Sequence, residues 1–162
     1  MKSSTRDHVV AATHFVLGPS NFLVLQLPDN WDLRLGRMPM DIDYTVFCDG
    51  IRWAQAGQAS ALLVDAKARR AVELTVRTAR ESITPLNLLD ARPGTCRIGG
   101  HDATYAIGAA NFGLFKTKHY AVLHIAYRCE ETKRFVDLRF MHKGSSEMLE
   151  GLLSPLEKSR CH

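Results

Sequence analysis

Residues 120–141, YAVLHIAYRCEETKRFVDLRFM, contain two runs in which apolar and polar side chains alternate on either side of a polar tip. Alternation with period two is typical of β-strands, and a short polar segment between two such runs indicates a hairpin. With the tip at residues 129–132, Arg128 lies opposite Lys133, and the apolar cross-strand pairs are Ile125–Val136, Leu123–Leu138 and Ala121–Phe140. One face is then apolar, and a buried face fixes the register of a strand pair. The segment predicts the centre of an antiparallel sheet.

The same register places His124 opposite Asp137 on the other face of the hairpin. A histidine beside a carboxylate is the arrangement of a general base and the group that orients it. The sequence names no nucleophile for this pair, and Arg139 is placed to compete for Asp137. We therefore prefer a structural contact, and keep a small hydrolase or metal-dependent enzyme using His124 and Asp137 as an alternative.

Strand patterns continue on the N-terminal side of this hairpin. Apolar runs over 21–31, 41–50 and 60–65 end at turn residues. The stretch 65–82 is ambiguous, because its Ala, Arg and Glu content favours a helix, whereas its apolar residues alternate with polar ones. We expect a strand that pairs back onto 60–65 through a turn at 66–69, with a helix as the alternative.

The segments around the hairpin complete the predicted fold. Residues 83–94 read as a connection with one helical turn, and residues 96–108 as a strand pair interrupted at Gly99-Gly100. After Ser145, a residue type that favours the N-cap position, the apolar residues take helical spacing. They are Met148, Leu149, Leu152, Leu153 and Leu156. We expect a helix here, bent or interrupted at Pro155 because proline lacks a backbone donor.

These patterns predict a single domain over residues 1–162. Its fold class is α+β, with a predominantly antiparallel sheet and a C-terminal helix packed on it.

The four cysteines, Cys48, Cys96, Cys129 and Cys161, form no CxxC pair. The spacing therefore argues against a zinc finger or a thioredoxin-type motif. A helix returning antiparallel to the last strand would bring Cys161 close to Cys129 at the hairpin tip. Cys129 and Cys161 are therefore the candidate pair for a disulfide that would pin the last helix, with free thiols as the alternative.

Metal ligands are abundant in the second half of the chain but lack a recognisable spacing. The histidines and cysteines there include His101, His119, His124, Cys129, His142, Cys161 and His162. No pair has helical i, i+4 or zinc-ribbon spacing. The sequence therefore predicts no metal site and no cofactor.

Residues 109–119, AANFGLFKTKH, form the predicted tip of a long hairpin. Apolar and cationic side chains lie together in this stretch, and they are Phe112, Leu114, Phe115, Lys116, Lys118 and His119. Apolar groups on a loop beside cations can bind a partner protein, an acidic ligand or a membrane surface. The alternative is that the loop folds back and buries its aromatic rings.

Composition places limits on the function. The net charge of +4 raises the odds of an anionic partner, but it is not concentrated enough to favour nucleic-acid binding, which we keep as an alternative. No apolar run is long enough to span a membrane, and the first residues lack the pattern of a signal peptide. We expect a cytoplasmic protein.

Two segments resemble proteins with the Mog1/PsbP-like fold. These are NFLVLQLPDNW (21–31) and IGGHDATYAI (98–107), the latter followed by a long hairpin and a C-terminal helix. The resemblance implies a central antiparallel sheet covered by helices, and a non-enzymatic accessory role in which the protein docks to partner proteins. The chain departs from that plan in lacking a long helix between its early and central strands. Our functional hypothesis is a non-catalytic binding or accessory protein acting through protein–protein contacts that include residues 109–119.

Overall fold

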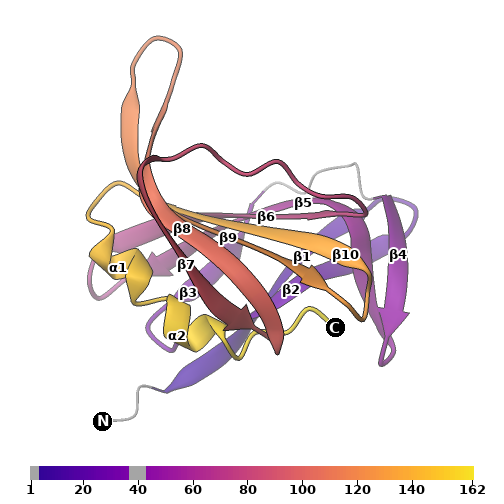
Figure 1. Cartoon of the computed structure of the whole chain (residues 1–162). Helices are drawn as coiled ribbons and strands as arrows, with labels where there is room; N and C mark the ends of the chain where they lie inside the picture. The colour runs from indigo at the N-terminus through magenta and orange to yellow at the C-terminus, as the bar shows by residue number, and fades with distance from the viewer. Residues whose placement is uncertain (1–3, 37–42) are drawn as a thin grey trace.

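The computed structural model describes residues 4–36 and 43–162, which form ten strands and two short helices (Figure 1). The strands are β1 (Thr5–His14), β2 (Gly18–Pro28), β3 (Asp32–Leu35), β4 (Asp43–Cys48), β5 (Ile51–Asp65), β6 (Arg70–Ala79), β7 (Leu89–Ile98), β8 (His101–Phe112), β9 (Lys118–Cys129) and β10 (Arg134–His142). The helices are α1 (Glu147–Glu150) and α2 (Leu153–Leu156). Residues 41 and 42 of the strand predicted over 41–50 lie outside the described part.

The sheet follows the order β1-β2-β5-β6-β10-β9-β8-β7, and β3 and β4 pair with β5 beside this path. The only parallel pairing among the described strands joins β2 to β5, at Asn21 and Trp53. The predicted antiparallel character of the sheet is therefore confirmed.

Strand β5 links two parts of the sheet. Its first residues pair with β4, and the rest, from Gly57 to Asp65, pairs with β6. The run predicted over 60–65 is thus the end of a 15-residue strand. The β5–β6 register closes at Asp65–Arg70, which confirms the turn at 66–69 and the strand that follows it. The helical alternative for 65–82 is wrong.

The β9–β10 hairpin has the predicted apolar face, but its register differs by two residues. Lys133 has a φ of 55° and ends a four-residue turn, so the closing pair is Cys129–Arg134. Ile125 therefore pairs with Leu138 and not with Val136. A shift of two residues keeps every side chain on its predicted face, whereas a shift of one would reverse the faces.

The predicted α+β class is wrong, because the described chain is mainly β and no long helix packs on the sheet. Helices α1 and α2 have four residues each and are separated at Gly151 and Leu152. In a continuous helix the N–H of residue 155 would donate to the carbonyl of Gly151, and Pro155 has no N–H to donate. The predicted apolar stripe is nevertheless buried, at Leu149, Leu152 and Leu156.

The connection between β6 and β7 contains no helical turn, contrary to our expectation for residues 83–94. Strand β7 begins at Leu89 and includes Pro93, which an edge strand tolerates. Leu86 and Leu88 of the connection pack with Val122, on the face of the sheet opposite α1 and α2. This face is therefore partly covered by the connection, as its course in Figure 1 also shows.

The main core lies on the other face of the sheet, beneath α1 and α2. Helix α2 packs against β2 and α1 against β9, and their leucines join the apolar residues of β5, β6, β9 and β10. Among the described residues, no helix is long and apolar enough to cross a membrane.

Candidate metal centre

Three neighbouring strands bring His101, Cys129 and Arg134 to one end of the sheet. Cys129, the last residue of β9, pairs with Arg134, the first residue of β10. The β8–β9 register pairs Ala103 with Tyr127, and its continuation by two residues places His101, the first residue of β8, beside Cys129. Because side chains alternate along a strand, these three lie on the core side of the sheet.

The segment after α2 brings Cys161 and His162 to the same place. Arg160 and Val24 of β2 exchange two backbone hydrogen bonds of 2.8 Å each. On the opposite side, the N–H of Gly99 in the β7–β8 turn donates to the carbonyl of Glu157 at 3.0 Å. Residues 157–162, which we call the C-terminal segment, therefore run between β2 and the β7–β8 turn.

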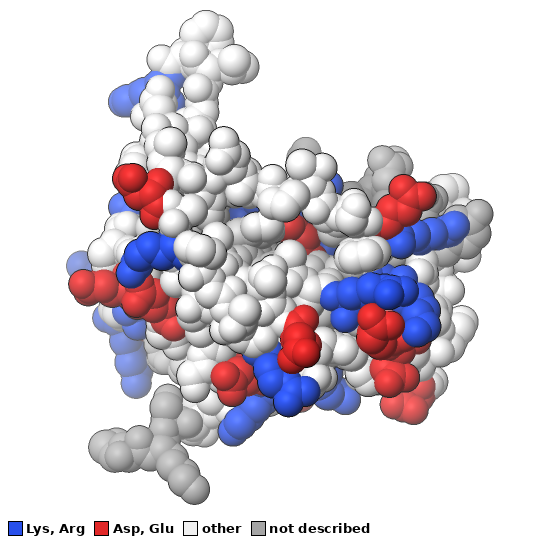
Figure 2. Space-filling view, viewed as in Figure 1, with Lys and Arg blue, Asp and Glu red and all other residues white. Residues whose placement is uncertain are grey.

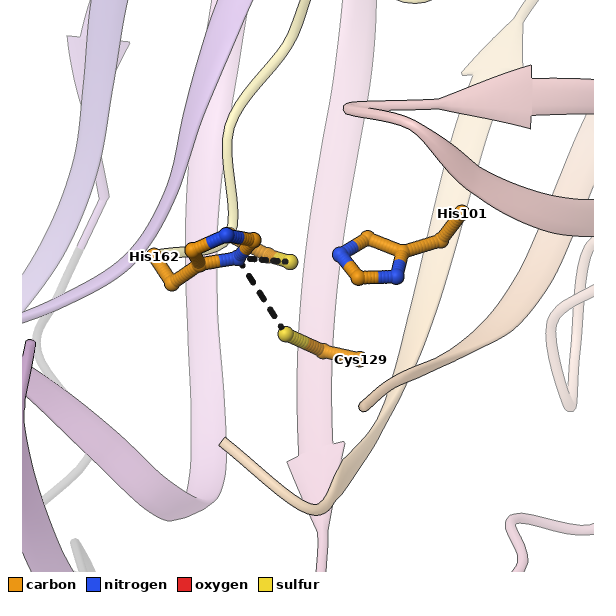
Figure 3. Close-up of side chains that lie close together, drawn as sticks. His101, Cys129 and His162 are labelled. Carbon is orange, nitrogen blue, oxygen red and sulfur yellow. Dashed lines mark hydrogen bonds between the residues drawn. The ribbon is translucent and has the colours of Figure 1, made fainter. Parts of the chain in front are cut away.

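The side chains of His101, Cys129, Cys161 and His162 converge on one small volume (Figure 3). One nitrogen or sulfur donor atom from each residue lies within 4.8 Å of the other three. Nδ1 of His162 is 3.6 Å from Sγ of Cys129 and 3.5 Å from Sγ of Cys161. Two thiols and two imidazoles at these distances form a candidate metal centre.

The imidazole of His101 is positioned by two neighbouring rings, and one of its nitrogens has no hydrogen-bond partner. Its ring stacks on Tyr127, with centroids 6.0 Å apart and an interplanar angle of 13°, and meets His162 edge to face at 5.4 Å. In Figure 3 the ring points toward Cys129 and His162. Nε2 of His101 is buried without a hydrogen-bond partner. A buried polar atom without a partner is unfavourable, and a metal bond would satisfy this one.

A fully buried arginine lies beside the two cysteines. Arg134 donates hydrogen bonds to the carbonyls of Ala54, Phe22 and Cys161, at 2.8, 2.6 and 2.7 Å. Its guanidinium also lies over the Trp53 ring, 5.3 Å from the centroid. These contacts attach the C-terminal segment to β2 and β5 through one side chain.

The buried Arg134 has no carboxylate partner among residues 4–36 and 43–162. Burial lowers the pKa of its guanidinium, but an arginine retains its charge in proteins. The groups that oppose this shift when ionised are Tyr127 and the three cysteines Cys161, Cys129 and Cys48. A cysteine thiolate is therefore the natural counter-ion of this buried cation.

The pair of cysteines shares a proton unequally. The hydrogen bond from the Cys161 thiol lowers the pKa of Cys129 to about 4, and further hydrogen bonds from Thr132 and His162 act in the same direction. The same interaction with Cys129, together with burial, raises the pKa of Cys161. This interaction favours the thiolate form of Cys129, and a thiolate is the form that binds metals.

The structure places Cys129 and Cys161 together but does not join them, so the candidate disulfide is not formed. Both are free and buried. The return that brings them together is made by two short helices and the C-terminal segment, in place of the straight helix that we expected. Cys48 and Cys96 are also free, and neither belongs to the cluster.

His124 and Asp137 are in contact, although they are diagonal and not opposite in the ladder. His124 pairs with Arg139, and its Nε2 is hydrogen-bonded to Oδ2 of Asp137. Both are buried, with 5% and 1% exposure. They do not belong to the cysteine and histidine cluster. The pair is thus a buried polar contact on the second face of the sheet, with little access for a substrate.

The predicted loop 109–119 is divided between strands and a shorter tip. Phe112 ends β8 and packs edge to face on Tyr120, whereas Leu114 and Phe115 are exposed. His119 is hydrogen-bonded to Asn111 across the hairpin, at 2.8 Å. Of the two aromatic rings in this loop, only Phe112 packs against the sheet, as the alternative of a folded-back loop expected.

Residue spacing could not reveal the four-residue cluster, because its members come from three separate parts of the chain. Arg134 did carry a signal that we missed. It occupies the same alternation as Val136, Leu138 and Phe140, and an arginine at a core-facing position is rarely buried without a specific partner.

No protein-family model, curated protein or solved structure matched this chain, so the function is argued from the geometry of the site itself.

Proposed function

We propose that this protein binds one zinc ion through His101, Cys129, Cys161 and His162, and that the metal fastens the C-terminal segment to the end of the sheet. The observation that carries the proposal is the convergence of four donor atoms within 4.8 Å from β8, β9 and the C-terminal segment. Two sulfur and two imidazole ligands in tetrahedral geometry are typical of zinc.

The two distances from His162 to the cysteine sulfurs fit this metal. Zinc lies about 2.3 Å from sulfur and about 2.0–2.1 Å from nitrogen, so neighbouring sulfur and nitrogen ligands of a tetrahedral site are about 3.5–3.6 Å apart. The two distances from Nδ1 of His162 to the cysteine sulfurs are 3.6 and 3.5 Å. Binding would replace the proton shared by Cys129 and Cys161 with the metal.

The ligand set favours a structural role for the metal. Catalytic zinc sites keep a coordination position for water, whereas four protein ligands leave none. The protein is therefore proposed to act as a non-catalytic binding or accessory protein, as inferred from its sequence. A cytoplasmic location is part of this proposal, because reducing conditions keep cysteine ligands as thiols.

Metal content tests the proposal. Protein purified under reducing conditions and passed over a desalting column should contain one zinc per chain by mass spectrometry of the metal. Cys161→Ser removes one ligand and should lower the affinity for zinc by at least about tenfold. Mutation of residues that merely orient metal ligands already lowers metal affinity by about 10–100-fold. Affinity is measured by competition with a chromogenic chelator.

Cys96→Ser is the matched control, since Cys96 lies outside the cluster, and it should retain wild-type affinity. The proposal is wrong if wild-type protein neither carries zinc nor takes it up from added zinc salt. It is also wrong if Cys161→Ser and Cys96→Ser weaken binding equally.

A further inference from the structure

The β8–β9 hairpin ends in two large apolar side chains that stand clear of the molecule. Leu114 and Phe115 are 98% and 103% exposed. In Figure 1 this hairpin projects well beyond the body of the protein. Its turn is fixed by Gly113, whose φ is 123° and where a Cβ would lie 2.3 Å from the carbonyl oxygen of Lys116. The two apolar side chains are therefore presented by a defined turn.

The charge around this tip has one sign. Lys116 directly follows the apolar pair, Lys118 comes two residues later, and both are exposed. No Asp or Glu occurs anywhere from Ala103 to Cys129. Figure 2 shows an uncharged tip with basic side chains just behind it, whereas acidic side chains begin only at the body of the molecule. The hairpin thus has two apolar side chains at its end and two lysines beside them.

The small area of this tip fits a lipid surface better than a protein. A stable protein interface buries about 800 Å² on each partner. Even an aromatic side chain buries only about 150–250 Å², so Leu114 and Phe115 together supply at most about half of that area. A lipid interface requires no complementary shape, and accepts apolar groups at the acyl boundary while lysines meet anionic headgroups.

We propose that residues 113–118 dock this protein onto membranes rich in anionic lipid, with Leu114 and Phe115 entering the interface and Lys116 and Lys118 contacting the headgroups. This docking is peripheral and independent of the metal centre, because the tip and the centre lie at opposite ends of β8.

Vesicle sedimentation tests the proposal with the intact protein. Vesicles of phosphatidylcholine mixed with phosphatidylserine should bind the wild type, and vesicles of phosphatidylcholine alone should bind it much less. Leu114→Ser with Phe115→Ser should lower the partition coefficient by at least about tenfold. Lys116→Gln and Lys118→Gln should each lower it about fivefold, and added salt should have the same effect.

Phe15→Ser with Val16→Ser is the matched control, since these residues are 86% and 68% exposed in the β1–β2 turn. The control should bind like the wild type, and both double variants should retain their metal content and melting temperature. Absence of wild-type binding to anionic vesicles overturns the proposal and leaves the tip to a partner protein. Equal losses in the two double variants overturn it as well.

Insertion of the tip can be measured separately. Phe115→Trp places an indole at the tip, and brominated acyl chains should quench its fluorescence when vesicles are added. Trp31 and Trp53 are buried and serve as the background in the wild type. Quenching that is no greater in Phe115→Trp than in the wild type contradicts insertion.

Discussion

At the scale of single residues, the structure depends on an arginine in the core. Arg134 has no exposed surface, and it replaces the apolar side chain that the alternation of β10 would place there. Its nitrogens satisfy carbonyls of two strands and of the C-terminal segment, and Nε donates to the hydroxyl of Thr132 at 3.1 Å. Arg134 is therefore both a packing residue and the cation beside the two cysteines of the proposed metal centre.

Arg134→Met should destabilise the protein, because methionine fills only part of the volume and cannot make the three hydrogen bonds that Arg134 donates to backbone carbonyls. At about 1 kcal/mol for each, the loss is about 3 kcal/mol, or about 6–12 °C in Tm for a chain of this size. Thermal unfolding followed by circular dichroism measures the change. Arg128→Met, at an exposed position in β9, should change Tm by no more than about 2 °C. Equal shifts for the two variants would show that the buried contacts of Arg134 contribute little.

Asp65, at the end of β5, is a second buried charged residue that makes several hydrogen bonds. Its carboxylate accepts hydrogen bonds from the N–H of Ala68, from Asn30 and from Arg70. The bond from Ala68 makes the largest contribution to lowering the pKa of Asp65 below its ordinary value. The charged carboxylate is therefore favoured by folding. Its contribution to stability is fully present above the unfolded pKa of about 3.9 and is lost as the pH falls through the lower folded pKa.

Asp65→Asn should lower the urea midpoint at pH 7, and the difference from the wild type should shrink as the pH falls below about 4. Urea unfolding at a series of pH values measures this dependence. Asp49→Asn, in the exposed β4–β5 turn, controls for the loss of one acidic charge. A difference between Asp65→Asn and the wild type that stays constant at all pH values would contradict the proposed role of the carboxylate.

At the scale of elements, the β7–β8 turn and the C-terminal segment fit each other closely. Gly99 has a φ of 57°, and a Cβ at this position would lie 2.4 Å from the carbonyl oxygen of Ser159. Gly100, the next residue, has a φ of 85°, but a Cβ there would meet no atom within 4 Å. Both glycines thus have a positive φ that disfavours other residues, but only Gly99 contacts the C-terminal segment.

Gly99→Ala should therefore be more destabilising than Gly100→Ala, because only the alanine at position 99 displaces the C-terminal segment. Overpacking of this kind costs about 1–3 kcal/mol, and we expect a difference of that size in the free energy of unfolding. It should also expose Cys161 to thiol reagents, since residues 159–161 are displaced together. Chemical unfolding and the rate of thiol labelling measure the two effects. Similar stability and labelling in both variants would mean that the segment is not held against this turn.

The elements also show how far the sequence could predict the fold. Alternation identified the β5–β6 and β9–β10 hairpins, and it gave the correct apolar face of the β9–β10 hairpin, because the side-chain period of a strand is visible locally. It could not fix the turn at Lys133, whose left-handed conformation shifted the register by two residues. The C-terminal stripe predicted burial correctly, but Gly151 and Pro155 divided the expected helix.

At the scale of the whole molecule, the C-terminal segment joins regions that are distant along the sheet. It lies between β2, near one edge of the sheet, and the β7–β8 turn at the other edge. The proposed metal centre would add β9 to this junction. Its four ligands could not be predicted from spacing, because only the folded sheet brings residues 101, 129 and 161–162 to one point.

Removal of zinc should loosen this junction and leave most of the sheet intact. A ligand present at about 100–1,000 times its Kd stabilises a protein by about 3–4 kcal/mol, so chelation should lower Tm by about 6–16 °C. Hydrogen exchange should increase at the paired amides of Val24 and Arg160, while amides in the centre of β9 and β10 remain protected. Uniform loss of protection would indicate global unfolding and contradict a local fastening role.

The most direct test of the account is X-ray absorption at the zinc edge of the reduced, zinc-loaded protein. We predict a first shell of two sulfur atoms at about 2.3 Å and two imidazole nitrogens at about 2.0–2.1 Å. Cys161→Ser should lose one of the sulfur atoms, and Cys96→Ser should keep both. A first shell of nitrogen and oxygen alone, or a sulfur count that Cys161→Ser leaves unchanged, would contradict the proposed centre.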